Sequence, residues 1–252
     1  AEIEMIDPCC EQRLLKSADA MRAYAARLER FDQAVRLAHG IPDRPLTDAN
    51  RLKLYVLRDQ RAIADFLGSP NVAGIYFGRA SGAVAFVHRG RPSHDKWELQ
   101  PEPVFFHEYT HHLMLSQLGD NALPAWMIEG YAEFFGTAEI LADGGVQIGA
   151  PPLARAYGLF NAEAYNATLS VKELVAANYK NLTGLQLESV YGKGWLLTHY
   201  MAFDPSRRGQ ISKYVKAIQQ GRQPLGPAPR ALARDEAPVA LADRLQHARR
   251  DP

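Results

Sequence analysis

Residues 105–112 read FFHEYTHH, and this stretch decides the interpretation of the chain around it. It lies within a segment, 103–118, whose pattern predicts a helix. Four residues advance a helix by slightly more than one turn, so His107 and His111 project from the same face. Their imidazoles can reach one zinc ion at roughly 2.0–2.1 Å. Glu108 points to the neighbouring side, where we expect it to act as a general base rather than as a ligand.

A third ligand is expected on the next predicted helix, residues 124–135. Glu129 follows His111 by eighteen residues, after a break short enough to fold the second helix back on the first. Glu129 and Glu133 lie four residues apart on an otherwise apolar face, where carboxylates need partners. We expect Glu129 to complete a site for one Zn²⁺ per chain with one open position. Glu133 would accept the free ring N–H of a histidine ligand, and a solvated carboxylate is the alternative.

Outward from these helices, the pattern of apolar residues and breakers predicts an α+β fold. A small mixed sheet with helices forms an N-terminal lobe that carries the HExxH helix, and a mainly helical lobe follows, with the active-site cleft between them. We expect one catalytic domain over 1–220, with lobes at about 1–121 and 122–220, and a weakly packed tail over 221–252. The predicted strands are 52–57, 74–77 and 83–88, with a hairpin around 143–145, and the other predicted helices are 17–39, 59–67, 171–177, 187–203 and 207–219.

The metal-ligand pattern resembles that of gluzincin zinc metallopeptidases, the clan of thermolysin-like and aminopeptidase-N-like enzymes. Glu129 begins the stretch EGYA, which matches the Glu-Gly-x-Ala form of aminopeptidase-N-like enzymes. The chain looks most like the bacterial peptidase-MA-like proteins. Residues 190–195, VYGKGW, resemble the Tyr-x-Lys-Gly segment of the same enzymes. The resemblance implies that Tyr191 stabilises the oxyanion, and a buried structural tyrosine is the alternative. His199 could line the cleft or be a core histidine.

The chain also departs from the aminopeptidase pattern. Aminopeptidases of this type carry Gly-x-Met-Glu-Asn, whose glutamate holds the free amine of the substrate. The corresponding residues here are 82–86, GAVAF, which contain no acid. We therefore expect an endopeptidase rather than an aminopeptidase. Ala83, Val84, Ala85 and Phe86 are expected in an edge strand that pairs with an extended peptide, as in the wider clan.

The composition and net charge of the chain limit the classes of partner that we expect it to bind. Its 252 residues are 47% apolar and carry a formal net charge of +1, which gives no electrostatic reason to expect nucleic acid or an anionic membrane. No apolar run is long enough to span a bilayer. The two cysteines, Cys9 and Cys10, are adjacent, so a disulfide framework is excluded. The compartment stays open: periplasmic or secreted if a signal peptide was removed, and cytoplasmic otherwise. The oligomeric state stays open as well.

The expected reaction is therefore zinc-dependent hydrolysis of a peptide bond in a peptide or protein substrate. Glu108 takes a proton from the attacking water, and Tyr191 helps to hold the developing oxyanion. Two alternatives stay open from the sequence. The first is a zinc hydrolase of a non-peptide amide or ester. The second is a zinc-binding module that has lost catalysis, although the intact Glu108 and Tyr191 argue against it.

Overall fold

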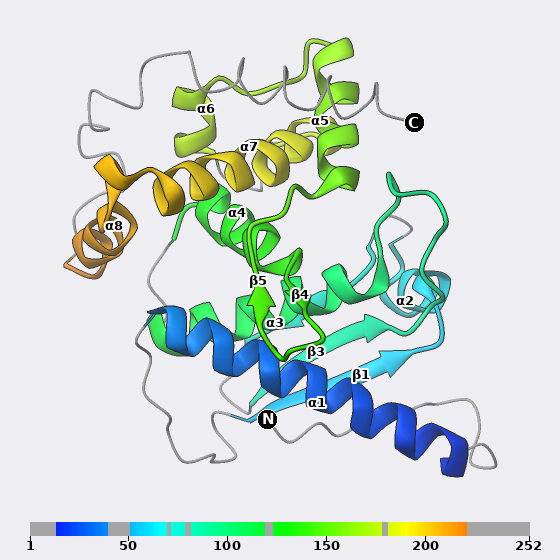
Figure 1. Cartoon of the computed structure of the whole chain (residues 1–252). Helices are drawn as coiled ribbons and strands as arrows, with labels where there is room; N and C mark the ends of the chain where they lie inside the picture. Colours follow the sequence, from blue (N-terminus) through cyan, green and yellow to red (C-terminus); the bar gives the residue numbers. More distant parts are fainter. Residues whose placement is uncertain are drawn as a thin grey trace. The chain divides into compact units, whose positions relative to one another are not determined.

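The computed structural model describes residues 14–39, 51–69, 72–78, 82–118, 123–177 and 181–220 (Figure 1). This part of the chain is α+β, as the sequence predicts, with one three-stranded and one two-stranded sheet. Cys9, Cys10 and the segment 221–252 lie outside the described residues. The elements are α1 (Leu14–His39), β1 (Leu52–Leu57), α2 (Gln60–Leu67), β2 (Ile75–Phe77), β3 (Ala83–His88), α3 (Pro101–Leu118), α4 (Ala125–Gly136), β4 (Glu139–Ile140), β5 (Val146–Gln147), α5 (Leu153–Ala164), α6 (Val171–Ala176), α7 (Gly184–Phe203), η3 (Pro205–Arg207) and α8 (Gln210–Gln219).

The larger sheet is mixed, with strand order β1-β3-β2. β1 runs parallel to β3, with Leu52 opposite Ala83, and β2 runs antiparallel to β3, with Ile75 opposite Phe86. Alternate residues of β1 and β3 are buried, which gives the sheet one face turned to the core. β4 and β5 form the small antiparallel hairpin that the sequence predicts around its Asp-Gly-Gly turn.

The prediction of an edge strand at Ala83, Val84, Ala85 and Phe86 was wrong, because β3 is the central strand of the sheet. From Val84 to Phe86 the strand is paired with β1 on one side and with β2 on the other. Its backbone N–H and C=O groups are thus used within the sheet and are not open to an added peptide strand. The apolar run was a sign of this central place, since a strand buried in the sheet tends to be apolar along its length.

The described residues fall into two compact units. The first unit reaches residue 120 and includes 131–154, and the second contains 121–130 and the described residues from 155 onward. The boundary therefore passes through α4, between Gly130 and Tyr131. The sequence pattern predicts 131–154 in the second lobe, whereas these residues belong to the first compact unit.

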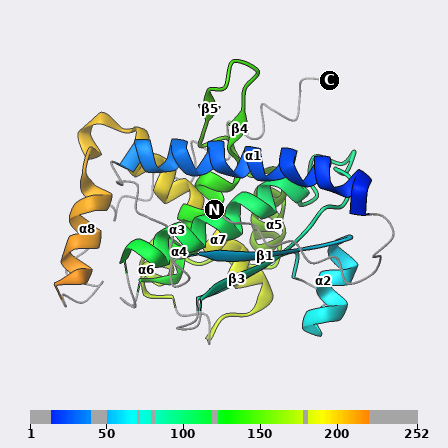
Figure 2. The ribbon, with the colours of Figure 1, turned by 90° about the horizontal axis from the view of Figure 1, so that it is seen from below.

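In the first unit, α3 packs between α1 and the larger sheet (Figure 2). Aromatic rings fill the α1–α3 contact: Phe31 stacks on Phe106 with ring centroids 4.3 Å apart, and Tyr24 stacks on Phe105 at 4.2 Å. α3 begins at Pro101, two residues before the predicted start. Pro101 and Pro103 both lie in the first turn of the helix, where a missing N–H costs no intrahelical hydrogen bond. Either proline can therefore begin the helix.

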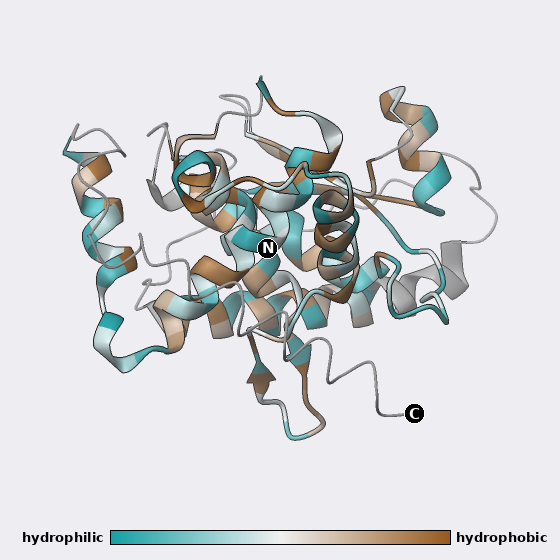
Figure 3. Cartoon of the chain, turned by 90° about the horizontal axis from the view of Figure 1, so that it is seen from above, coloured by the Kyte–Doolittle hydropathy of each residue, from teal (hydrophilic) through white to brown (hydrophobic). Residues whose placement is uncertain are grey.

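In the second unit, α7 contacts both α6 and α8. α6 and α7 each begin with a capping box, in which Ser170 and Thr183 accept hydrogen bonds from backbone N–H groups three residues later. Hydrophobic and hydrophilic residues are interspersed along α8 (at the left of Figure 3), with Ile218 buried and Lys213 exposed. One buried face is therefore enough to anchor this helix.

Candidate metal centre

α3 brings His107 and His111 together on one face, as their spacing predicts. The two Nε2 atoms lie 3.1 Å apart, and the two rings are almost perpendicular, with centroids 4.7 Å apart. Two nitrogen ligands of one tetrahedral zinc ion stand about 3.4 Å apart, given bond lengths of about 2.0–2.1 Å. The imidazoles are thus arranged much as a shared metal ion requires, and both are buried.

Glu129, on α4, joins this pair. One potential ligand atom from each of His107, His111 and Glu129 lies within 4.8 Å of the other two, and all three residues are buried. Two imidazole nitrogens and one carboxylate oxygen form a donor set that suits zinc, and three protein ligands leave a coordination position open. This buried group could therefore hold a metal ion.

The next turn of α4 contacts the same histidine from its other side. Glu133 Oε1 lies 3.2 Å from His107 Nδ1, which is ion-pair distance without hydrogen-bond alignment. Since Nε2 of His107 faces His111, Nδ1 is the ring atom that remains for a carboxylate. Metal-binding histidines commonly donate a hydrogen bond from this ring atom to a supporting acid, and Glu133 lies close to it.

A glycine allows α4 to come this close to α3. A methyl group on Gly136 would lie 3.1 Å from Pro103 O and 3.3 Å from His107 Cβ, tighter than most real Cβ contacts. The last turn of α4 is thus packed directly against the turn of α3 that bears the first histidine. Nothing in the sequence pattern identified Gly136, because its role depends on a contact between two helices.

Glu108 is buried beside a second glycine that the sequence analysis missed. A Cβ atom on Gly74, the residue before β2, would lie 2.8 Å from Val104 Cγ1, 2.9 Å from Glu108 Cγ and 3.0 Å from Glu108 Oε1. The chain entering β2 therefore packs against the glutamate side chain itself. In this way the sheet limits the positions that the Glu108 carboxylate can occupy.

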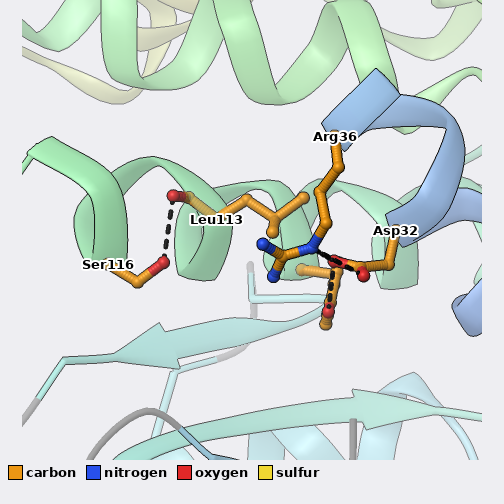
Figure 4. A network of polar contacts seen from close by, with 5 residues as sticks. Asp32, Arg36, Leu113 and Ser116 are labelled. Atoms are coloured by element: carbon orange, nitrogen blue, oxygen red, sulfur yellow. Dashed lines mark hydrogen bonds and ion pairs between the residues drawn. The ribbon is translucent and has the colours of Figure 1, made fainter. Parts of the chain in front are cut away.

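The far side of α3 is held by a polar network with α1. The Tyr109 hydroxyl donates a hydrogen bond of 3.0 Å to Asp32 Oδ1. Arg36 Nε contacts both oxygens of Asp32 at 2.9 and 2.8 Å (Figure 4). Burial and then the charge of Asp32 hold the pKa of Tyr109 well above its usual value, so the hydroxyl remains a donor. Tyr109 lies about 200° around the helix from His107, so the network fixes α3 from the side opposite the two histidines.

The strand β2 also contacts this helix next to His111. Tyr76 Oη lies 3.5 Å from Nδ1 of His112, and the Tyr76 ring is 6.5 Å from the ring of His111. Burial raises the pKa of Tyr76, which keeps this hydroxyl protonated. Edge strand β2 and the His-Glu-x-x-His helix are therefore in side-chain contact.

Tyr191, the expected oxyanion donor, lies half-buried on α7. The guanidinium carbon of Arg155, on α5, lies 3.9 Å from the centroid of its ring, a cation–π contact that sequence analysis did not foresee. α7 also meets α4 at a close crossing. A Cβ atom on Gly130 would lie 2.2 Å from the carbonyl carbon of Gly194. The glycines of the EGYA and YGKG stretches thus contact each other, which links the helix of Glu129 to the helix of Tyr191.

His199 lies one helical turn from two aromatic rings on α7. Its ring centroid is 4.9 Å from that of Trp195 and 4.7 Å from that of Phe203. The other residues proposed for the cleft, Ala83 to Phe86, form the centre of the sheet, as described above.

Comparison with known proteins adds nothing to this geometry: no protein-family model matches the sequence, and no curated protein matches it. Among the described helices, none has the combination of length and apolarity that a membrane-spanning helix requires.

Proposed function

We propose that the chain is a zinc-dependent peptidase of the gluzincin type. The single observation that carries the proposal is the buried His107, His111 and Glu129 group, in which one helix supplies two imidazoles and the next supplies a carboxylate. Bound there, one zinc ion would lower the pKa of a coordinated water toward about 7 and polarise a carbonyl group.

Glu108 is the proposed general base. It accepts a proton from the attacking water and returns it to the leaving amine. The support for this role is its place one residue after the first ligand, its burial, and its close packing against Gly74 and Val104. A carboxylate held in this way loses little freedom when the reaction begins.

Tyr191 is the proposed hydrogen-bond donor to the oxyanion. Two contacts support the assignment. Arg155 lies over the face of its ring, and the Gly130–Gly194 crossing ties α7 to the helix of Glu129. A tyrosine fixed by both a cation and a helix crossing is suited to a positioning task.

The proposed substrate is an internal peptide bond of an extended chain. β2, and not β3, is the strand at the sheet edge beside α3. Its first residue follows Gly74, which touches Glu108, and Tyr76 reaches His112. An extended peptide could add to β2 through main-chain hydrogen bonds and so lie next to the base.

Glu108→Gln tests the proposal most directly. We expect it to retain one zinc per chain by metal analysis but to lose at least about 10²-fold of its activity on a quenched peptide. The control is Glu102→Gln, which removes a partly exposed carboxylate from the first turn of the same helix and should leave activity intact. Full activity of Glu108→Gln would refute the assigned base, and absence of bound metal in the wild type would refute the centre.

A substrate panel decides the class of bond. Activity on esters or small amides without activity on peptides would reject the peptidase and indicate a hydrolase of non-peptide bonds. Metal binding without any hydrolysis would indicate a binding module.

A further inference from the structure

A buried arginine stands at the junction between α7 and α8, far along the chain from the metal ligands. Arg207, the last residue of η3, is only 8% exposed. Its guanidinium carbon lies 4.6 Å from the centroid of the Tyr200 ring, and its Nη1 donates to Gln210 Oε1 at 3.3 Å. Its Nε is fully buried and has no hydrogen-bond partner among the described residues. A buried cationic donor left in this state is costly, so the arrangement suggests an additional partner.

The same guanidinium lies at the start of α8. The hydrogen bond to Gln210, the first residue of that helix, brings the two together. The N-cap of α8 is Gly209, with φ of 78°, and no side chain caps the helix. The first turn of α8 also contains no acidic residue. The first-turn N–H groups of a helix carry a partial positive charge, so Arg207 and the helix start repel each other unless an anion lies between them.

Asp204, whose pKa the charge of Arg207 also lowers, does not fill this role. Asp204 Oδ1 accepts hydrogen bonds from the N–H and the hydroxyl of Ser206, at 2.8 and 2.7 Å. These hydrogen bonds are the main reason why the pKa of Asp204 is lowered, and the charge of Arg207 contributes least. Asp204 is half-buried and is occupied in capping η3, so among the described residues Arg207 Nε has no carboxylate partner.

We propose that Arg207 and the N-terminal turn of α8 form a binding site for an oxyanion, either a carboxylate or a phosphate group. Since Nη1 is engaged by Gln210, the edge formed by Nε and Nη2 is the one that would bind two oxygens side by side. The Tyr200 ring lies over one face of the guanidinium, so the ligand would bind in the plane of the group and not over that face. Backbone N–H groups of the first turn of α8 would bind the remaining oxygens.

This site is distinct from the proposed catalytic centre. Tyr191 and the end of α7 are twelve residues apart, about 18 Å along a helix. The ligand would bridge the end of α7 and the start of α8, and would stabilise the folded second unit by mass action.

The first experiment titrates the full-length wild-type chain with inorganic phosphate and, separately, with acetate, while chloride keeps the ionic strength constant. We expect a saturable rise in Tm with at least one of the two anions. We also expect chemical-shift changes at the amides of Gln210, Ile211 and Ser212 in ¹H–¹⁵N spectra. A response to phosphate alone identifies a phosphoryl ligand, and a response to acetate identifies a carboxylate. No saturable response to either anion beyond that of chloride would overturn the proposal.

A matched pair of variants then tests the residue. Arg207→Gln and Arg208→Gln remove the same charge from adjacent positions, but Arg208 is exposed. We expect at least about a tenfold loss of anion affinity in the first variant and less than about a twofold loss in the second, because charge-assisted bidentate hydrogen bonds are lost only in the first. Equal losses would overturn the proposal, since they would indicate general attraction to positive charge. If Arg207→Gln does not fold, Arg207→Lys keeps the charge but lacks Nε, and undiminished binding in that variant would equally refute the site.

Discussion

Replacing Gly130 with alanine tests whether the crossing of α4 and α7 holds Glu129 in place. The added Cβ would lie 2.2 Å from the carbonyl carbon of Gly194, 2.3 Å from its oxygen and 2.6 Å from its Cα. These are backbone atoms of a helix, so no flexible side chain can turn away. An ordinary Cβ contact begins at 3.4 Å, so the helices must separate locally by about 1 Å.

Two opposing effects set the size of the change in stability. Alanine is favoured over glycine in a helix interior by about 1 kcal/mol. Overpacking of a close contact costs about 1–3 kcal/mol, and a contact with rigid backbone belongs at the upper end of that range. We therefore expect Gly130→Ala to lower the free energy of unfolding by about 1–2 kcal/mol. In Gly184→Ala, at the start of α7, the new Cβ meets nothing within 4 Å, so stability should be unchanged or slightly raised.

Urea denaturation of the two variants and the wild type measures the first effect. A competition titration with a metal chelator measures the second, since a shift of about 1 Å beside Glu129 should weaken metal binding in Gly130→Ala but not in Gly184→Ala. The reasoning would be refuted if Gly130→Ala proved as stable as Gly184→Ala, because helix preference alone would then explain both.

The remaining predictions concern three further contacts. Gly74→Ala places a Cβ 2.9 Å from Glu108 Cγ, so we expect kcat to fall about tenfold or more while the metal content stays intact. An unchanged kcat would show that this contact does not position Glu108. Tyr109→Phe removes the hydrogen-bond donor to Asp32 and should lower the free energy of unfolding by about 1.5–3 kcal/mol, as measured by urea denaturation. A much smaller loss of stability would show that the network does not hold α3. Asp59→Ala removes the N-cap of α2 at a cost of about 1 kcal/mol, while Asp59→Asn should retain most of the cap. The backbone hydrogen bond of the cap lowers the pKa of Asp59. The stability that its charge contributes should therefore persist above pH about 4 and decline only as the pH falls through the lowered pKa. A difference in stability between wild type and Asp59→Ala that did not change with pH would contradict this.

Local patterns made much of the fold predictable. Strand 52–57 and strand 83–88 appear with the predicted limits, because partial alternation in the first and a continuous apolar run in the second are properties of each segment alone. The helix at 59–67 was bounded by Asp59 and Gly68, and the structure shows a side-chain cap at the first and a left-handed φ of 66° at the second. The three metal-ligand candidates were predictable for the same reason, since helical spacing places two of them on one face.

Features that depend on distant contacts were not predictable. The order of strands in the sheet decides whether β3 is central, and no property of residues 83–88 alone specifies their neighbours. The Tyr109–Asp32 contact joins residues 77 positions apart, and Arg155 reaches Tyr191 from another helix. Helix α5 was missed although Pro151 and Pro152 precede it, because Gly158 and scattered polar residues weaken its pattern.

The glycine pair at 130 and 194 bears on how relatives of this chain would diverge. A descendant that lost the hydrolysis proposed above would have no chemical reason to keep a carboxylate at 108. It would still require hydrogen atoms instead of methyl groups at both crossing positions in order to assemble the same helices. Among relatives, glycines at 130 and 194 should therefore indicate a shared fold, whereas an acid at 108 should indicate that the proposed activity is retained.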